Sequence, residues 1–289
     1  MLKPQLDALV AGFPHALRLL RDPVEVPHRF TRPRDIEVVA LLSACIAYGR
    51  VDLFKPRLEE LVRRLGSAPA RTVAGLDARG AAEVVEGINY RFNLPADFAV
   101  LLLGMGRILN QHGSIEAVFA EALEQTGQLH SALGTLTSRL RDVELAEVER
   151  HAGPTRGLAH LLPSPLGAGA AKRLNLYLRW MVRGPDPVDF GIWKRVPASA
   201  LLVPLDTHLH RLATNLGFTK RTDLSWRTAE EVTAGLRRLD PEDPVKYDFA
   251  LCHLGMSGAC PQKARAASCA ACSLRSACRT GGRLLKRPG

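Results

Sequence analysis

Four cysteines near the C-terminus have the spacing of a metal-binding segment. They are Cys260, Cys269, Cys272 and Cys278, separated by eight, two and five residues. Thiolates within so short a segment close around one metal at little cost in loop entropy, and the Cys-x2-Cys pair supplies two adjacent ligands. The residue types and their spacing therefore predict a bound metal centre.

The same spacing favours one kind of centre over another. Structural zinc sites usually combine two short Cys-x2-Cys pairs, whereas this segment has one such pair in a continuous run. We expect a [4Fe–4S] cluster, with zinc as the alternative and four unrelated reduced thiols as the third interpretation. Residues 1–5 do not resemble a secretory signal, so a reducing cytoplasm is expected. Cys45 and Cys252 lie in apolar helical patterns and are expected to be small buried side chains.

A second candidate is an acidic residue at the predicted start of a helix. Asp206 precedes residues 207–216, in which leucines recur at helical spacing, so its carboxylate belongs at the N-cap. N-capping alone explains an aspartate there. A carboxylate at a helix N-terminus can also stabilise a cationic sugar or receive a proton from a nucleophile. The adjacent His208 lacks metal-ligand spacing and is expected to face solvent or DNA.

Upstream, a glycine-containing turn joins two predicted helices. Gly167 and Gly169 lie in this turn, and a strongly helical stretch follows over residues 170–183. Glycines let a backbone approach a phosphate closely, and the first amides of the second helix are free donors at its positive end. An ordinary helical hairpin, with glycines for tight packing, explains the pattern equally well.

Lys172 and Arg173 lie in the first turn of that second helix. The helix field and the neighbouring cation both disfavour a protonated Lys172, which is how an amine becomes nucleophilic near neutral pH. A solvated lysine that contacts a phosphate is the simpler interpretation, and the pattern alone does not separate the two.

Composition limits the classes of partner. The chain has 289 residues and carries 39 Lys and Arg against 29 Asp and Glu, a formal net charge of +10. Such a charge favours a polyanion partner. No uncharged apolar run reaches the length of a membrane span, so a transmembrane helix is excluded and no membrane partner is expected.

Helical periodicity dominates the chain, and no convincing alternating strand is present, so the fold is predicted to be all-α. Residues 35–48 are apolar on more than one face, which is typical of a central buried helix. Further helices are expected over residues 53–65, 81–87, 96–109, 114–122 and 129–140. Four aromatic residues are candidates for a pocket or a DNA wedge, although aromatics at helical spacing belong more often to a core: Tyr48, Tyr177, Trp180 and Trp193.

The order of these features resembles the helix-hairpin-helix DNA glycosylases of the endonuclease III type. The similar features, within residues 35–280, are the stretch 41–45, the glycine hairpin with Lys172, residues 204–211, the helical stretch 243–255 and the four cysteines. The resemblance implies two helical domains, with a helix-hairpin-helix motif at the cleft. One is a six-helix barrel over residues 36–160, and the other, residues 1–35 with 161–289, holds the cluster.

The resemblance also implies a role for each site residue. Asp206 matches the catalytic aspartate of that family, and Lys172 is the best match to its Schiff-base lysine. The implied DNA contacts are Gly167, Gly169, Arg173, His208, Lys263 and Arg265, and the implied cluster ligands are Cys260, Cys269, Cys272 and Cys278. Two features depart from the family: residues 162–169 replace its Leu-Pro-Gly-Val-Gly hairpin, and 33 residues separate Lys172 from Asp206.

The function expected from this resemblance is base excision repair. The chain would be a monomeric, cytoplasmic, nucleoid-associated DNA glycosylase of a divergent bacterial branch, with possible AP lyase activity. It would bind double-stranded DNA, extrude a damaged or abasic nucleotide and excise the base. The alternatives are a non-catalytic iron–sulfur protein that recognises damaged or branched DNA and a zinc-stapled RNA-binding protein.

Overall fold

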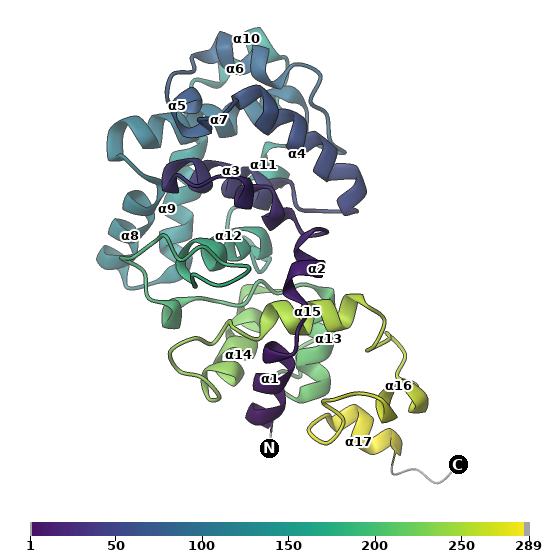
Figure 1. Cartoon of the computed structure of the whole chain (residues 1–289). Coiled ribbons are helices and arrows are strands. Elements are labelled where there is room, and N and C mark those ends of the chain that lie inside the picture. Colours follow the sequence, from purple (N-terminus) through teal and green to yellow (C-terminus); the bar gives the residue numbers. More distant parts are fainter. Residues whose placement is uncertain (1, 286–289) are drawn as a thin grey trace. The chain divides into compact units, whose positions relative to one another are not determined.

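The computed structural model describes residues 2–285, and the regular elements in that range are helices (Figure 1). Strand pairing in the described part is limited to an isolated bridge between Tyr90 and Asn93. The predicted all-α class is therefore confirmed. None of the described helices is long and apolar enough to cross a bilayer.

The described chain separates into two compact units, each built from discontinuous segments. Unit 1 contains residues 1–18, 168–179 and 197–289, and unit 2 contains residues 19–167 and 180–196. Residues 19–35, 161–167 and 180–196 thus group with unit 2, although the sequence assigned them to the cluster domain. The six-helix barrel and the predicted domain roles remain predictions.

Unit 2 is organised around α3 (Pro33–Ile46), which is buried at every residue from Asp35 to Ile46. This outcome matches the expectation of a central helix, because apolar side chains on all faces of a helix need surrounding partners. Gly104 lets another helix pass close by, since a Cβ atom there would lie 2.0 Å from the Leu140 carbonyl oxygen. The remaining helices of unit 2 are η1 (Pro23–Glu25), η2 (Pro27–Arg29), α4 (Val51–Leu65), α5 (Pro69–Ala74), α6 (Ala78–Val85), α7 (Pro95–His112), α8 (Ile115–Thr126), α9 (Leu129–Arg141), α10 (Leu145–Ala152) and α11 (Leu158–Leu161).

Unit 1 contains the helices that carry most of the predicted site residues. They are α1 (Leu2–Ala11), the first eight residues of α12 (Lys172–Val182), η3 (Ala198–Ala200), α13 (Thr207–Leu216), α14 (Trp226–Arg237), α15 (Asp248–Met256), α16 (Ala266–Ala270) and α17 (Arg279–Leu285). The remaining helix, α2 (His15–Leu19), lies at the boundary between the units.

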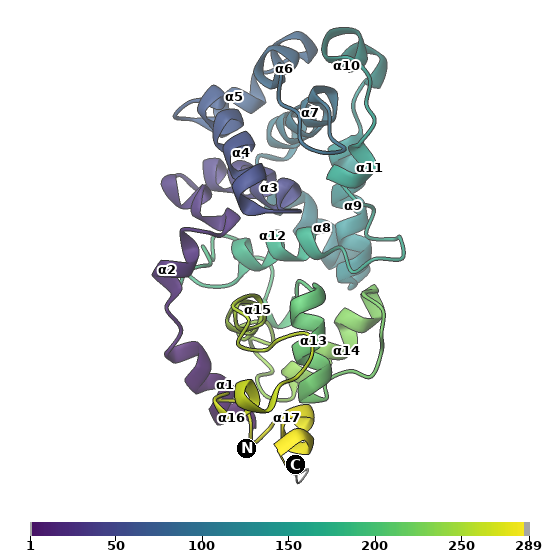
Figure 2. The same ribbon diagram turned by 90° about the vertical axis from the view of Figure 1, so that its right-hand side faces the viewer.

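Helix α13 buries the leucine stripe that the sequence predicted. Leu209, Leu212 and Leu216 are all buried, and α15 lies beside α13 (Figure 2). Gly255 permits this close contact, because a Cβ atom there would lie 3.1 Å from the Cβ atom of His208.

A buried ion pair joins α12 to α15. Arg179 Nε lies 2.9 Å from Asp248 Oδ1, and the two side chains are only 2% and 5% exposed. Arg179 also lies over the ring of Phe249, 5.6 Å from its centroid. The pair ties α12 to α15 at this point, because desolvated charges are stable only while they remain paired.

Candidate functional site

Asp206 caps α13, as the sequence predicted. Its backbone is extended, and its Oδ1 atom accepts hydrogen bonds from the backbone N–H groups of His208, at 2.9 Å, and Leu209, at 2.8 Å. These bonds satisfy two of the free donors at the helix N-terminus and stabilise the ionised carboxylate. The other oxygen, Oδ2, is left to interact with groups outside the helix.

Cys252 of α15 supplies that interaction. Its Sγ atom lies 3.4 Å from Asp206 Oδ2, within the range of a thiol-to-carboxylate hydrogen bond. Burial raises the pKa of the Cys252 thiol well above its ordinary value, and the negative charge of Asp206 raises it further. The thiol therefore stays protonated and acts as the donor. The sequence predicted only a small buried side chain at this position.

Lys172 lies near the same two residues. It is partly buried at the start of α12, and its positive charge lowers the pKa of Cys252, against the larger effect of burial. Three different elements therefore supply Lys172, Asp206 and Cys252, because Lys172 begins α12, Asp206 caps α13 and Cys252 lies in α15.

The other predicted DNA contacts differ in how exposed they are. Lys263 and Arg265 are exposed in the cysteine segment, Gly169 is exposed before α12, and Arg173 is partly exposed. His208 Nδ1 is buried without a hydrogen-bond partner in the described part of the chain. Gly167 is exposed as well but belongs to unit 2, so the predicted hairpin crosses the boundary between the units.

The four cysteines of the C-terminal segment gather near one another. Burial raises the pKa of Cys269, and the sulfurs of Cys278 and Cys260 raise it further. Burial likewise raises the pKa of Cys272, with added contributions from the other three. Within residues 2–285, however, no group of three or more His, Cys, Asp or Glu side chains is arranged as a metal site.

Helix α13 anchors this cysteine segment at the end opposite Asp206. Asn215 Nδ2 lies 3.7 Å from Cys260 Sγ, and Cys278 Sγ lies 3.8 Å from the Asn215 carbonyl oxygen. The Gly281 N–H donates to Cys278 Sγ at 3.3 Å. Amide donors to cysteine sulfur are one means by which proteins tune iron–sulfur clusters, so this donor set fits such a group.

A family model described as "Protein of unknown function (DUF2400)" matches residues 22–257. The chain belongs to this family. The curated proteins yield no match. The matched region contains Lys172, Asp206 and Cys252 but ends before Cys260, the first of the four C-terminal cysteines. These three residues therefore lie in the part of the chain that the family model matches.

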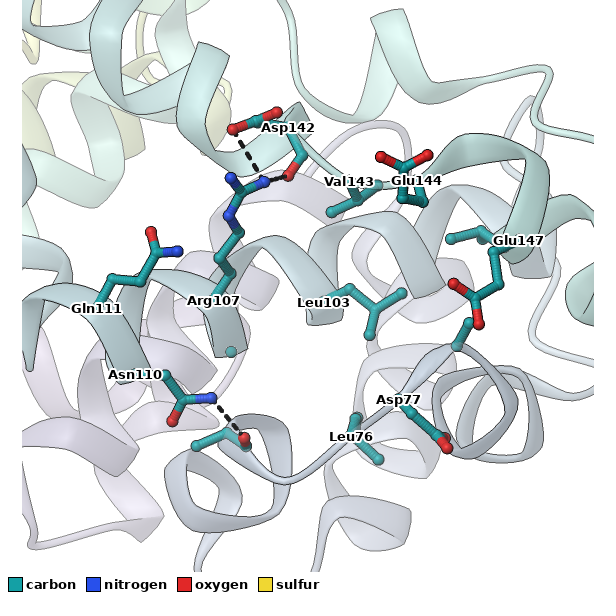
Figure 3. Close-up of a pocket in the computed structure, with 14 residues that line it drawn as sticks. Leu76, Asp77, Leu103, Arg107, Asn110, Gln111, Asp142, Val143, Glu144 and Glu147 are labelled. Atoms are coloured by element: carbon teal, nitrogen blue, oxygen red, sulfur yellow. Dashed lines mark hydrogen bonds and ion pairs between the residues drawn. The ribbon is translucent and has the colours of Figure 1, made fainter.

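An open pocket of about 440 Å³ in unit 2 is lined by several acidic residues (Figure 3). Arg107, one of its lining residues, forms an ion pair with Asp142 at 2.9 Å. The carboxylates of Asp77, Glu144 and Glu147 also line the pocket. Because these acidic groups repel phosphate, the pocket is unsuited to a nucleic-acid backbone.

Three of the four aromatic candidates belong to the core. Tyr177 and Trp180 are fully buried, and Trp193 is 2% exposed with its indole N–H donating to Glu37 Oε1 at 2.7 Å. Their burial agrees with the core interpretation, which the sequence analysis favoured for aromatics at helical spacing, and leaves none of the three as an exposed wedge. The fourth, Tyr48, is partly buried, and its hydroxyl donates to the Tyr90 carbonyl at 3.0 Å.

A tight turn in unit 2 presents an aromatic residue that the sequence analysis missed. The Tyr90–Asn93 bridge closes a two-residue turn in which Phe92 is 59% exposed. Arg91 has a left-handed φ of 52° and lies over the Phe92 ring, 5.5 Å from its centroid. Non-glycine residues in this conformation are strained and occur often at functional sites.

Proposed function

We propose that this protein is a DNA glycosylase that excises a damaged base. The observation that carries the proposal is the placement of Asp206, whose Oδ1 is held by two helix-terminal amides while Oδ2 lies beside Cys252 in the electrostatic neighbourhood of Lys172. A fixed carboxylate near an amine suits a reaction that develops positive charge on a sugar and needs a nucleophile. The resemblance to helix-hairpin-helix glycosylases supports the same assignment.

In the proposed reaction, Asp206 offsets the oxocarbenium charge that forms as the N-glycosidic bond breaks. If the Lys172 amine attacks the sugar C1′, its electron pair forms the C–N bond and the base leaves with the bonding pair. Collapse to an imine opens the ring and permits elimination of the 3′ phosphate, which is AP lyase chemistry. If water attacks instead, Asp206 accepts its proton and an abasic site remains.

DNA contact is supported by charge and by the exposed turn. A net charge of +10 attracts the phosphate backbone, and the exposed Lys263 and Arg265 add local cations. Phe92, with Arg91 against its ring, provides an aromatic surface on which a base can stack. These features favour double-stranded DNA with a damaged or abasic nucleotide as the partner of a monomer in the nucleoid.

The metal centre belongs to the same proposal. Cys260, Cys269, Cys272 and Cys278 would hold a [4Fe–4S] cluster, with zinc as the alternative. When bound, the cluster would cross-link the segment that carries Lys263 and Arg265. Iron and sulfide analysis of the purified protein distinguishes the two metals, because a zinc site contains neither element.

Borohydride trapping on abasic and single-lesion duplexes tests the proposed reaction. Reduction of an imine links protein to DNA covalently, so we expect the wild-type protein to be trapped and Lys172→Ala to lose trapping. Lys3→Ala is a matched control, because Lys3 is paired with Asp7 in α1. Base release without trapping would assign the attack to water. Tight binding of lesion DNA without base release would support the non-catalytic alternative instead.

Replacement of the exposed aromatic gives a separate prediction. Phe92→Ala is expected to weaken binding to lesion DNA by about 5- to 150-fold, because stacking on one base contributes roughly 1–3 kcal/mol. Fluorescence anisotropy at fixed salt measures the loss. Leu145→Ala, another exposed apolar side chain of unit 2, should leave the affinity unchanged. Equal affinity of Phe92→Ala and wild type would remove the turn from the DNA interface.

A further inference from the structure

The proposed reaction uses Asp206 and Lys172 but assigns no role to the thiol between them. Oδ1 of Asp206 is fixed by two backbone donors, and among the described residues Cys252 is the donor recorded to Oδ2. Backbone amides of α13 therefore hold one oxygen of the carboxylate, and the Cys252 thiol of α15 holds the other.

We propose that Cys252 is a positioning residue for Asp206: its thiol donates to Oδ2 and holds the carboxylate in one orientation. This inference rests on the proposed function, because it assigns Asp206 the catalytic role. A carboxylate bound at Oδ1 alone can still turn about its Cβ–Cγ bond, whereas a second donor at Oδ2 removes that freedom. Orientation matters because a catalytic charge must lie where the charge of the transition state develops.

The surroundings keep the thiol in the donor form. The charged groups that act on Cys252 are Asp206 on α13, Lys172 on α12 and Asp248 on its own helix. Burial and the two carboxylates raise its pKa, and Lys172 opposes them. A thiol is also a weak donor, so it orients the carboxylate while withdrawing less charge from it than a hydroxyl would. Met256 Sδ, 3.8 Å away, is a weaker acceptor than the carboxylate and does not compete.

Two substitutions of Cys252 separate the loss of its hydrogen bond from the loss of its side-chain volume. Cys252→Ala removes the donor and is expected to lower the rate of base excision by about 3- to 10-fold, the effect of one lost hydrogen bond. Cys252→Ser restores a donor and should return the rate toward the wild-type value. Cys45→Ala, a thiol of α3 in the other unit, is the matched control.

Alkylation kinetics test the contact without any catalytic activity. Iodoacetamide modification of Cys252 is followed against pH by peptide mapping in the full-length protein. Asp206→Asn removes a charge that raises the thiol pKa, so alkylation should begin at lower pH than in wild type. Lys172→Ala removes a charge that lowers it, so alkylation should begin at higher pH. These opposite shifts are not expected from a general loosening of the site.

The outcomes distinguish this inference from the proposed function. An unchanged alkylation midpoint in Asp206→Asn overturns the positioning role, whatever the enzyme does. An active enzyme whose Cys252→Ala variant keeps the wild-type rate overturns it as well. Loss of the proposed function alone has a different pattern: wild type releases no base from any lesion, while the two alkylation shifts still establish the contact.

Discussion

Asp206→Asn is expected to abolish base excision while leaving the fold intact. The substitution removes the negative charge that would offset the oxocarbenium ion, and loss of such a catalytic group costs about 10²- to 10⁴-fold in rate. Asparagine is as good an N-cap as aspartate, so α13 should keep its start. Single-turnover base release from a panel of single-lesion duplexes measures the rate, and urea unfolding measures the stability.

A second capping aspartate provides the control for this variant. Asp77 caps α6 through a 2.7 Å hydrogen bond from the Gly80 N–H, and it lies in unit 2. Asp77→Asn should leave both rate and stability unchanged. Asp206→Ala should lose activity and also about 1 kcal/mol of stability, because alanine cannot cap the helix. Full base release by Asp206→Asn would refute the catalytic role.

The features that were predictable from sequence depend on local rules. The N-cap at Asp206 follows from a capping residue placed just before a leucine stripe, and α13 buries that stripe. The burial of α3 follows from apolar residues on all its faces. In both cases the information lies within one or two helical turns, so no knowledge of distant packing is needed.

The features that were missed depend on packing between distant segments. Cys252 meets Asp206 across 46 residues, and an apolar helical pattern gives no indication of that neighbour. The turn at Arg91 and Phe92 contains no glycine, although Arg91 adopts a left-handed conformation that glycine usually supplies. A core role was the favoured interpretation for Trp193, but its contact with Glu37, 156 positions earlier in the chain, could not be read from the local pattern.

The sequence analysis did not weigh the ion pair of Arg179 with Asp248. This pair ties α12, which begins at Lys172, to α15, which carries Cys252. We therefore expect it to contribute to the placement of Lys172, while Asp206 is held by its own contacts with α13 and Cys252.

Breaking that ion pair is expected to have the largest effect on stability. Arg179→Met leaves the Asp248 carboxylate buried without its cation, and such a loss typically costs about 3–5 kcal/mol. The urea midpoint of the full-length protein should fall accordingly. Arg79→Met is the matched control, since Arg79 forms an exposed pair with Glu83 on the surface of α6 and should change the midpoint little.

The double variant separates the effect of the ion pair on stability from its effect on the position of Lys172. Arg179→Met with Asp248→Leu removes both buried charges, so unfolding stability should recover toward wild type, because an apolar pair of similar volume packs without a desolvation cost. Because apolar contacts are not directional, the position of α12 relative to α15 is then less strictly fixed. We therefore expect the double variant to be stable yet slow in base release. A double variant that is both stable and fully active would show that the ion pair does not position Lys172.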